Sequence, residues 1–296
     1  MRMKLLLLVA AFFFQIPEAH AAAIHDAAKK GDIAGLTAAL DAGADVNASS
    51  EVATPLYYAA DGAHLEAAKL LIERGANVNL AFKWGPPLLA AAYSGKPEML
   101  RLLLDAGADP ATVFQGETAL HIVAGKGCLD CVVALVEKGA DVNALSSFRQ
   151  PPIHFAVKKG HKAVADYLLS HGYTMPAPPP VAHRLATADP VKGEAIFAKT
   201  CRKCHYSKLT SGSLAGPSLW NIVGRKRGAV EGYRYSTVLR GVGGDWSYEN
   251  LNVFIFDPTR AIPGVDMIFP GIQDDAERAD LIAFLRTRSD HPLPLP

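Results

Sequence analysis

The sequence predicts an all-α protein in which a repetitive helical solenoid precedes a smaller helical domain. Three observations support this fold class. Glycines recur every 32 or 33 residues within residues 22–173, as in a solenoid of short repeats. A proline-rich tract at residues 174–188 then interrupts the helical pattern. Residues 189–290 begin and end with segments of helical periodicity, and a length of 296 residues suits about two domains.

Residues 1–21 have the features of a secretory signal peptide. Arg2 and Lys4 supply a charged start, an apolar run extends from Leu5 to Ile16, and Ala19-His20-Ala21 fits the small-x-small cleavage rule. The apolar run is shorter than the roughly twenty residues that a membrane-spanning helix needs. We therefore expect cleavage after Ala21 and a mature protein that is exported, soluble and periplasmic.

The repeat is defined by two markers that keep the same phase. A glycine closes the second helix of each unit as a C-cap, because that position needs a positive φ. A Thr-Pro-Leu-like segment begins 21 residues before the glycine in four units. We read five units in residues 22–173, and the first lacks this segment, as expected of a unit that caps a solenoid. The marker glycines are Gly43, Gly75, Gly107, Gly139 and Gly172.

These units resemble ankyrin repeats over about half of the chain. The resemblance rests on Thr54-Pro55-Leu56, on Thr118-Ala119-Leu120, and on Ala-Asp-Val-Asn or a close variant at residues 44–47, 76–79 and 140–143. It implies a stack of helix pairs with β-turn fingers along one edge and a function in binding protein. We therefore expect the array to dock a protein partner.

Cys128 and Cys131 in the fourth unit have the spacing of a haem attachment site, but Val132 stands where a histidine would be required. The two thiols could form a redox-active disulfide at the start of a helix. They could instead be a small, half-buried packing pair. The sequence leaves both interpretations open.

Two further groups in the array also allow alternatives. Three histidines could be ligands, or they could be structural histidines, since they fall where ankyrin repeats carry one: His25, His121 and His154. Four aromatic residues fall in or near the predicted fingers, where polar residues are commoner: Phe82, Trp84, Phe114 and Phe148. These rings either stack finger on finger or form a patch for a partner.

Residues 174–188 contain Pro176 and the run Pro178-Pro179-Pro180, without periodicity. Such a tract favours extended polyproline geometry and acts as a semi-rigid spacer. We expect it to keep the array and the following domain apart.

The following domain contains Cys201-Arg202-Lys203-Cys204-His205, the attachment signature of a c-type haem. Two thiols at this spacing can form thioether bonds to the haem vinyl groups, and the adjacent imidazole can be an axial iron ligand. An axial imidazole needs an acceptor for its other N–H, and the carbonyl of Pro217 is a candidate.

Met267 is the candidate for the second axial ligand. It follows the Pro263-Gly264 turn, which would hold the thioether in a loop beside the ring. Buried haem propionates need paired charge or several hydrogen bonds. Arg225, Tyr235 and Trp246 can supply the donors.

Two helices are expected to close the pocket. Asp189 and Pro190 begin the first by the N-cap and N1 rules. The second, at residues 274–288, has an apolar stripe at helical spacing. Because Gly193 has no side chain, we expect the two helices to cross there.

Residues 189–290 resemble a class I cytochrome c of the mitochondrial and α-proteobacterial type, over about a third of the chain. The resemblance implies one covalent haem c. Phe254 stands where the family has a tyrosine near the methionine sulfur, so that hydrogen bond is absent. The roles that carry over are thioether attachment at Cys201 and Cys204, axial ligation by His205 and Met267, imidazole acceptance by Pro217, and propionate binding by Arg225, Tyr235 and Trp246.

We predict an electron-transfer protein rather than an enzyme, because six-coordinate iron leaves no site for a substrate. The net charge of +1 does not suggest nucleic-acid binding. The partner would be a redox protein docked by the ankyrin array. The alternative is an ankyrin-based binding or protective scaffold whose haem acts as a redox sensor or weak peroxidase.

Overall fold

The computed structural model describes residues 16–50, 52–208 and 214–296, and these residues divide between two compact units, 1–144 and 145–296. The described residues form helices and isolated β-bridges but no strand, which confirms the all-α prediction. Within these residues, no helix is both long and apolar enough to cross a membrane. Most of the predicted signal peptide lies outside the described residues.

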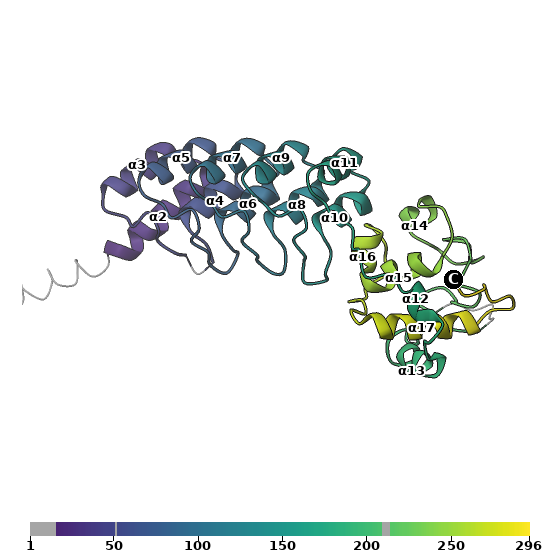
Figure 1. Cartoon of the computed structure of the whole chain (residues 1–296). Coiled ribbons are helices and arrows are strands. Elements are labelled where there is room, and N and C mark those ends of the chain that lie inside the picture. The colour runs from purple at the N-terminus through teal and green to yellow at the C-terminus, as the bar shows by residue number, and fades with distance from the viewer. Residues whose placement is uncertain (1–15, 51, 209–213) are drawn as a thin grey trace, which may run out of the picture. The chain divides into compact units, whose positions relative to one another are not determined.

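The described residues of the first unit form four helix pairs (Figure 1). Helices α2, α4, α6 and α8 form one layer, and α3, α5, α7 and α9 form the other, with loops projecting from one edge. The first layer comprises α2 (Ile16–Lys30), α4 (Pro55–Asp61), α6 (Pro87–Ser94) and α8 (Ala119–Lys126). The second comprises α3 (Ile33–Asp41), α5 (Leu65–Glu73), α7 (Pro97–Asp105) and α9 (Leu129–Glu137).

Local sequence explains where these helices begin and end. The Thr54 side chain accepts a hydrogen bond of 3.0 Å from the Tyr57 amide, and Pro55 fits the first turn of α4. Gly107, just after α7, has a φ of 90°. A Cβ added to it would meet no atom within 4 Å, so there is space for a side chain. The backbone conformation rather than space therefore requires glycine at this marker position.

Asparagine side chains connect neighbouring units of the array. Asn79 Oδ1 accepts from the Asp109 amide at 2.9 Å, and Asn79 Nδ2 donates to the Gly107 carbonyl at 3.0 Å. Asn47 makes the corresponding bonds to the Asn77 amide and the Gly75 carbonyl. The asparagine of the Ala-Asp-Val-Asn segment thus satisfies backbone groups of the next unit.

The structure bears on some of the open alternatives in the array. Cys128 and Cys131 form a disulfide at the start of α9. Phe114 lies against Gly85, where an added Cβ would be 3.1 Å from its ring, so one finger stacks on the next. The Trp84 ring lies 5.9 Å from that of Tyr57 yet is 46% exposed, and Phe148 is 63% exposed.

The second unit begins with a fifth helix pair, α10 (Pro152–Lys159) and α11 (Lys162–Ser170). We refer to residues 145–173 as the last repeat. Beyond it, residues 174–208 and 214–296 contain six helices: α12 (Ala182–Leu185), α13 (Pro190–Thr200), α14 (Thr237–Gly241), α15 (Tyr248–Phe256), α16 (Pro258–Ala261) and α17 (Asp275–Thr287).

Helices α13 and α17 cross at Gly193, as predicted. A Cβ on Gly193 would lie 2.0 Å from the Asp280 carbonyl oxygen, and the Phe197 and Phe284 rings pack with centroids 5.4 Å apart. The Asp189 amide donates to Asp280 Oδ1 at 2.7 Å. The two helices therefore touch through backbone as well as side chains.

The tract predicted to be a spacer is partly packed structure. Val181 and Leu185 are 0% and 3% exposed, and the Val181 and Ala182 amides donate to Glu249 Oε1 at 3.1 and 3.0 Å. The Asn252 side chain also donates to the Pro179 carbonyl at 2.9 Å. The expectation that this tract keeps the array and the following domain apart is wrong for the last repeat, because Gly264 and Thr259 of that domain hydrogen-bond to His154 and Arg149.

Candidate haem site

The attachment signature lies at the C-terminal end of α13. The Cys201 amide still donates to the Phe197 carbonyl at 2.9 Å, and the Cys204 and His205 amides donate to the Cys201 carbonyl at 3.0 and 2.9 Å. This turn brings three side chains to one cavity, which Cys201, Cys204 and His205 all line. Cys201 is half-buried and Cys204 exposed, and burial raises the pKa of the Cys201 thiol.

The imidazole of His205 is fixed by the loop that follows it. Nδ1 donates to the Pro217 carbonyl at 2.8 Å, the contact expected from the sequence. The Gly216 amide donates to the Cys204 carbonyl at 2.8 Å, which draws the loop back over the signature. Burial lowers the pKa of His205, and the neutral ring with its proton on Nδ1 offers the Nε2 lone pair to a metal.

Gly216 is a functional position that the sequence reasoning did not single out. A Cβ there would lie 2.2 Å from Cε1 and 2.5 Å from Nδ1 of His205. No side chain larger than hydrogen fits beside the ring in this orientation. The glycine preceding the expected acceptor, Pro217, was visible in the sequence, but its contact with the imidazole was not.

Met267 lines the same cavity. Its loop turns at Gly264, whose φ is 87°, and the Val265 amide closes the turn on the Ile262 carbonyl at 3.1 Å. Ile268, the next residue, is 73% exposed. The structure therefore brings the thioether to the cavity that the two cysteines and His205 also line.

The predicted propionate-binding residues also line the cavity, and they differ in their partners. Arg225 donates from Nη1 to the Trp220 carbonyl at 2.6 Å and from Nη2 to the Ser218 carbonyl at 3.1 Å. Its Nε is buried with no hydrogen-bond partner among the described residues. The Tyr235 hydroxyl accepts from the Val230 amide at 3.3 Å, which leaves its own proton available.

The cavity has a volume of about 390 Å³. Most of its walls are apolar side chains, and its polar lining residues include the signature, Arg225, Tyr235 and Asp266. Apolar walls suit a flat apolar ring, the two thiols can attach it, His205 and Met267 can supply axial donors, and the unpaired buried Nε of Arg225 can bind a carboxylate. The apolar lining residues include Leu219, Ile222, Leu239, Leu251, Phe254, Ile255, Val265, Leu281 and Leu285.

The three array histidines differ in their partners. His25 Nε2 contacts the Ala48 carbonyl and the Ser50 amide, and His121 Nδ1 accepts from the Thr118 amide at 3.1 Å, as expected of structural histidines. His154 differs, because its Nδ1 accepts from the Gly264 amide at 3.0 Å. The described residues contain no group of three or more His, Cys, Asp or Glu that could hold a metal ion.

Comparison with known proteins matches two families to different parts of the chain. The family model for ankyrin repeats (3 copies) matches residues 4–82, 24–113 and 88–177, and the model for cytochrome c matches residues 190–289. The chain is 39% identical over 158 residues to a cytochrome c homolog of Bradyrhizobium diazoefficiens, covering 52% of the chain and 83% of that relative.

Two other relatives match a shorter region. Cytochrome c2 of Rhodomicrobium vannielii is 38% identical over 107 residues, which is 36% of the chain and 85% of the relative. The cytochrome c-type cyt cy of Rhodobacter capsulatus is 39% identical over 101 residues, which is 34% of the chain and only 50% of the relative. The chain therefore belongs to the cytochrome c family, whose members carry covalently bound haem c and transfer electrons, and it bears ankyrin repeats before its cytochrome c domain.

Proposed function

We propose that this chain is a periplasmic single-electron carrier whose ankyrin array docks its redox partner. In this proposal, Cys201 and Cys204 form the thioether bonds, and His205 and Met267 are the axial ligands. Bound haem c supplies the one-electron chemistry. The observation that carries the proposal is that all four side chains line one cavity and that the His205 ring is already fixed by Pro217.

The surrounding residues have distinct tasks. The Pro217 carbonyl holds the Nδ1 proton of His205 and so leaves Nε2 free to bind a metal, for which the imidazole would be a stronger donor. Arg225, Tyr235 and Trp246 would hold the propionates, and the buried Nε of Arg225 provides a charge-assisted donor. Apolar side chains on the cavity walls would exclude water from a bound haem and so lower the dielectric around it.

The array side of the proposal rests on exposed aromatic surface. Within residues 1–144, Trp84 is 46% exposed and Tyr93 is 54% exposed. Aromatic side chains are enriched at protein interfaces and often dominate their binding energy. The predicted signal peptide supports the periplasmic location.

The attachment is tested by mass spectrometry of denatured protein from cells that mature c-type cytochromes. We expect one porphyrin per chain, its loss when both Cys201 and Cys204 are replaced by Ala, and its retention in the matched variant Cys128→Ala/Cys131→Ala. Protein without attached porphyrin would refute the assignment. Fractionation of the same cells tests the location, since the processed chain should appear in the periplasm.

The ligand and partner assignments need separate measurements. Met267→Ala should remove the sulfur-to-iron charge-transfer band of the ferric protein, and an unchanged band would refute Met267 as the ligand. To test the docking proposal, the full chain is used to capture a partner protein, and the purified partner must then exchange electrons with the chain. Trp84→Ser and Tyr93→Ser should weaken that capture without changing the haem spectrum. Rapid peroxide turnover with slow electron exchange would instead favour the scaffold with a haem sensor or weak peroxidase.

A further inference from the structure

His154 lies three residues after the first residue of the Thr-Pro-Leu-like segment. The residues at this position in the other repeats show whether the repeat needs a histidine there. In the fourth repeat, His121 Nδ1 accepts from the backbone amide of Thr118, the first residue of the motif. The last repeat has Pro151 at that position, and proline has no N–H to donate. The third repeat also starts with two prolines, and there the same register is filled by Leu89, which is 2% exposed. A histidine is therefore not needed to build a repeat of this kind.

The imidazole of His154 has its partner in the cytochrome c domain. Its Nδ1 accepts from the Gly264 amide at 3.0 Å, and the residue is 1% exposed. Its Nε2 is buried with no hydrogen-bond partner among the described residues. Burial lowers the pKa of His154 to about 4, so the ring is neutral near pH 7 and the Nδ1 lone pair remains available as an acceptor.

Gly264 and its neighbours lie directly against the last repeat. A Cβ on Gly264 would be 2.9 Å from Val157 Cγ1 and 3.4 Å from the Lys158 amide nitrogen, both in α10. Lys158 Nζ also pairs with Asp266 Oδ1 at 3.2 Å. Gly264 and Asp266 are respectively three residues and one residue before Met267, so these contacts hold the segment that leads into the proposed ligand.

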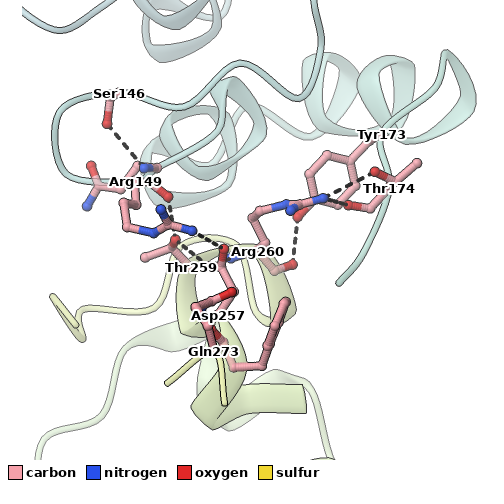
Figure 2. A network of polar contacts seen from close by, with 10 residues as sticks. Ser146, Arg149, Tyr173, Thr174, Asp257, Thr259, Arg260 and Gln273 are labelled. Carbon is pink, nitrogen blue, oxygen red and sulfur yellow. Dashed lines mark hydrogen bonds and ion pairs between the residues drawn. The ribbon is translucent and has the colours of Figure 1, made fainter. Parts of the chain in front are cut away.

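A second set of contacts holds α16, the helix that precedes this loop (Figure 2). Thr259 Oγ1 donates to the Arg149 carbonyl at 2.7 Å, and Arg149 Nη2 contacts the buried Asp257 carboxylate at 3.5 Å. The Tyr173 hydroxyl donates to the Arg260 carbonyl at 2.6 Å. The last repeat therefore contacts both the helix before the loop and the turn within it.

We propose that His154 is a positioning residue for the Met267 loop: by accepting the Gly264 N–H, the last ankyrin repeat restrains this loop and opposes loss of the sulfur ligand from the iron. This inference rests on the proposed role of Met267 as axial ligand. The last repeat then serves as part of the haem-site structure as well as the end of a docking array.

The test compares His154→Leu with His154→Asn in the full-length, haem-loaded protein. Leucine is the natural occupant of this register at Leu89, so it should preserve the repeat while removing the acceptor. Asparagine places its Oδ1 close to where Nδ1 stands and should restore the bond. The first readout is hydrogen exchange of the Gly264 amide, which should become faster in His154→Leu and return toward the native rate in His154→Asn.

The second readout is the displacement of Met267 by added imidazole, followed by loss of the sulfur-to-iron charge-transfer band. Loss of one buried hydrogen bond should raise the apparent imidazole affinity of His154→Leu about five- to tenfold. His121→Leu is the matched control, since it removes a histidine at the same register that bonds to Thr118 within its own repeat. We expect that variant to bind imidazole as the native protein does.

The possible results separate this inference from the ligand assignment. If Met267→Ala abolishes the band but His154→Leu binds imidazole and exchanges the Gly264 amide like the native protein, the positioning role is refuted alone. If Met267→Ala leaves the band unchanged, the ligand assignment fails and this inference fails with it. If His154→Leu does not fold, His154→Ala removes the same acceptor with a smaller side chain, and an unchanged imidazole affinity in that variant would refute the inference.

Discussion

The carbonyl oxygen of Asp280 in α17 lies where the side chain of residue 193 would begin. A Cβ added to Gly193 would be 2.0 Å from this oxygen and 2.7 Å from Phe284 Cβ. Backbone cannot withdraw as a flexible side chain can, so the two helices would have to separate. Their contact forms one wall of the domain core, since Phe197 and Phe284 are both buried there.

Gly193→Ala should therefore destabilise the protein by about 3 kcal/mol, near the upper end of the usual overpacking cost. Urea unfolding followed by far-ultraviolet circular dichroism measures the change. Gly241→Ala is the control, because a Cβ there meets no atom within 4 Å in α14. Equal unfolding midpoints for the two variants would show that α13 and α17 can shift apart without cost.

Arg278 is fully buried in α17, and its side chain satisfies backbone groups just after the Met267 loop. Nε donates to Asn252 Oδ1 at 2.7 Å, and Nη1 donates to the Ile272 and Gln273 carbonyls at 3.0 and 2.7 Å. Arg278→Met would leave these acceptors unsatisfied, and we expect a loss of about 3 kcal/mol in the free energy of unfolding.

The control for this prediction lies on the same helix. Arg286→Met removes a single exposed hydrogen bond, to the Leu293 carbonyl, and should cost less than about 1 kcal/mol. Chemical denaturation of both variants provides the comparison. An Arg278→Met protein as stable as Arg286→Met would mean that the acceptors find other partners.

Features set by local sequence could be predicted. The helix starts at Thr54 and Asp189 follow from side chains that bond to nearby amides, and the crossing at Gly193 follows from the missing side chain. The His205 contact with the Pro217 carbonyl also spans only twelve residues. The two helix starts and the His205 contact involve residues that are near each other in the sequence. For the crossing at Gly193, the apolar stripe of residues 274–288 indicates the partner helix.

Contacts between the last repeat and the cytochrome c domain could not be predicted in this way. His154 and Gly264 are 110 residues apart, and no periodic pattern links them. The burial of Val181 and Leu185 could not be predicted either, because a proline-rich composition indicates a stiff segment but not which of its side chains become buried. Pro151 was the one local sign, since it removes the amide that His121 uses in the preceding repeat.

Gly216 should influence how strongly His205 donates to the haem iron. In Gly216→Ala, the new methyl group would overlap Cε1 of the ring and push the imidazole away from the Pro217 carbonyl. A weaker Nδ1–H bond makes the imidazole a poorer donor, which destabilises the ferric state and raises the reduction potential. Redox titration measures this shift, with Gly241→Ala as the control. A native potential together with a native spectrum would contradict the prediction.

The buried neutral His154 should make the protein less stable in acid. Its pKa falls from 6.5 to about 4 because burial disfavours the charged ring, with nearby Lys158 adding to this and Asp266 opposing it. Between these two values the unfolded chain binds a proton that the folded protein does not, so stability falls as the pH is lowered from about 6.5 to about 4. The full shift corresponds to about 3 kcal/mol.

His154→Leu cannot take up this proton, so its free energy of unfolding should decline less over the same range. Parallel stability curves for the two proteins from pH 7 to pH 4 would show that His154 titrates normally in the folded state.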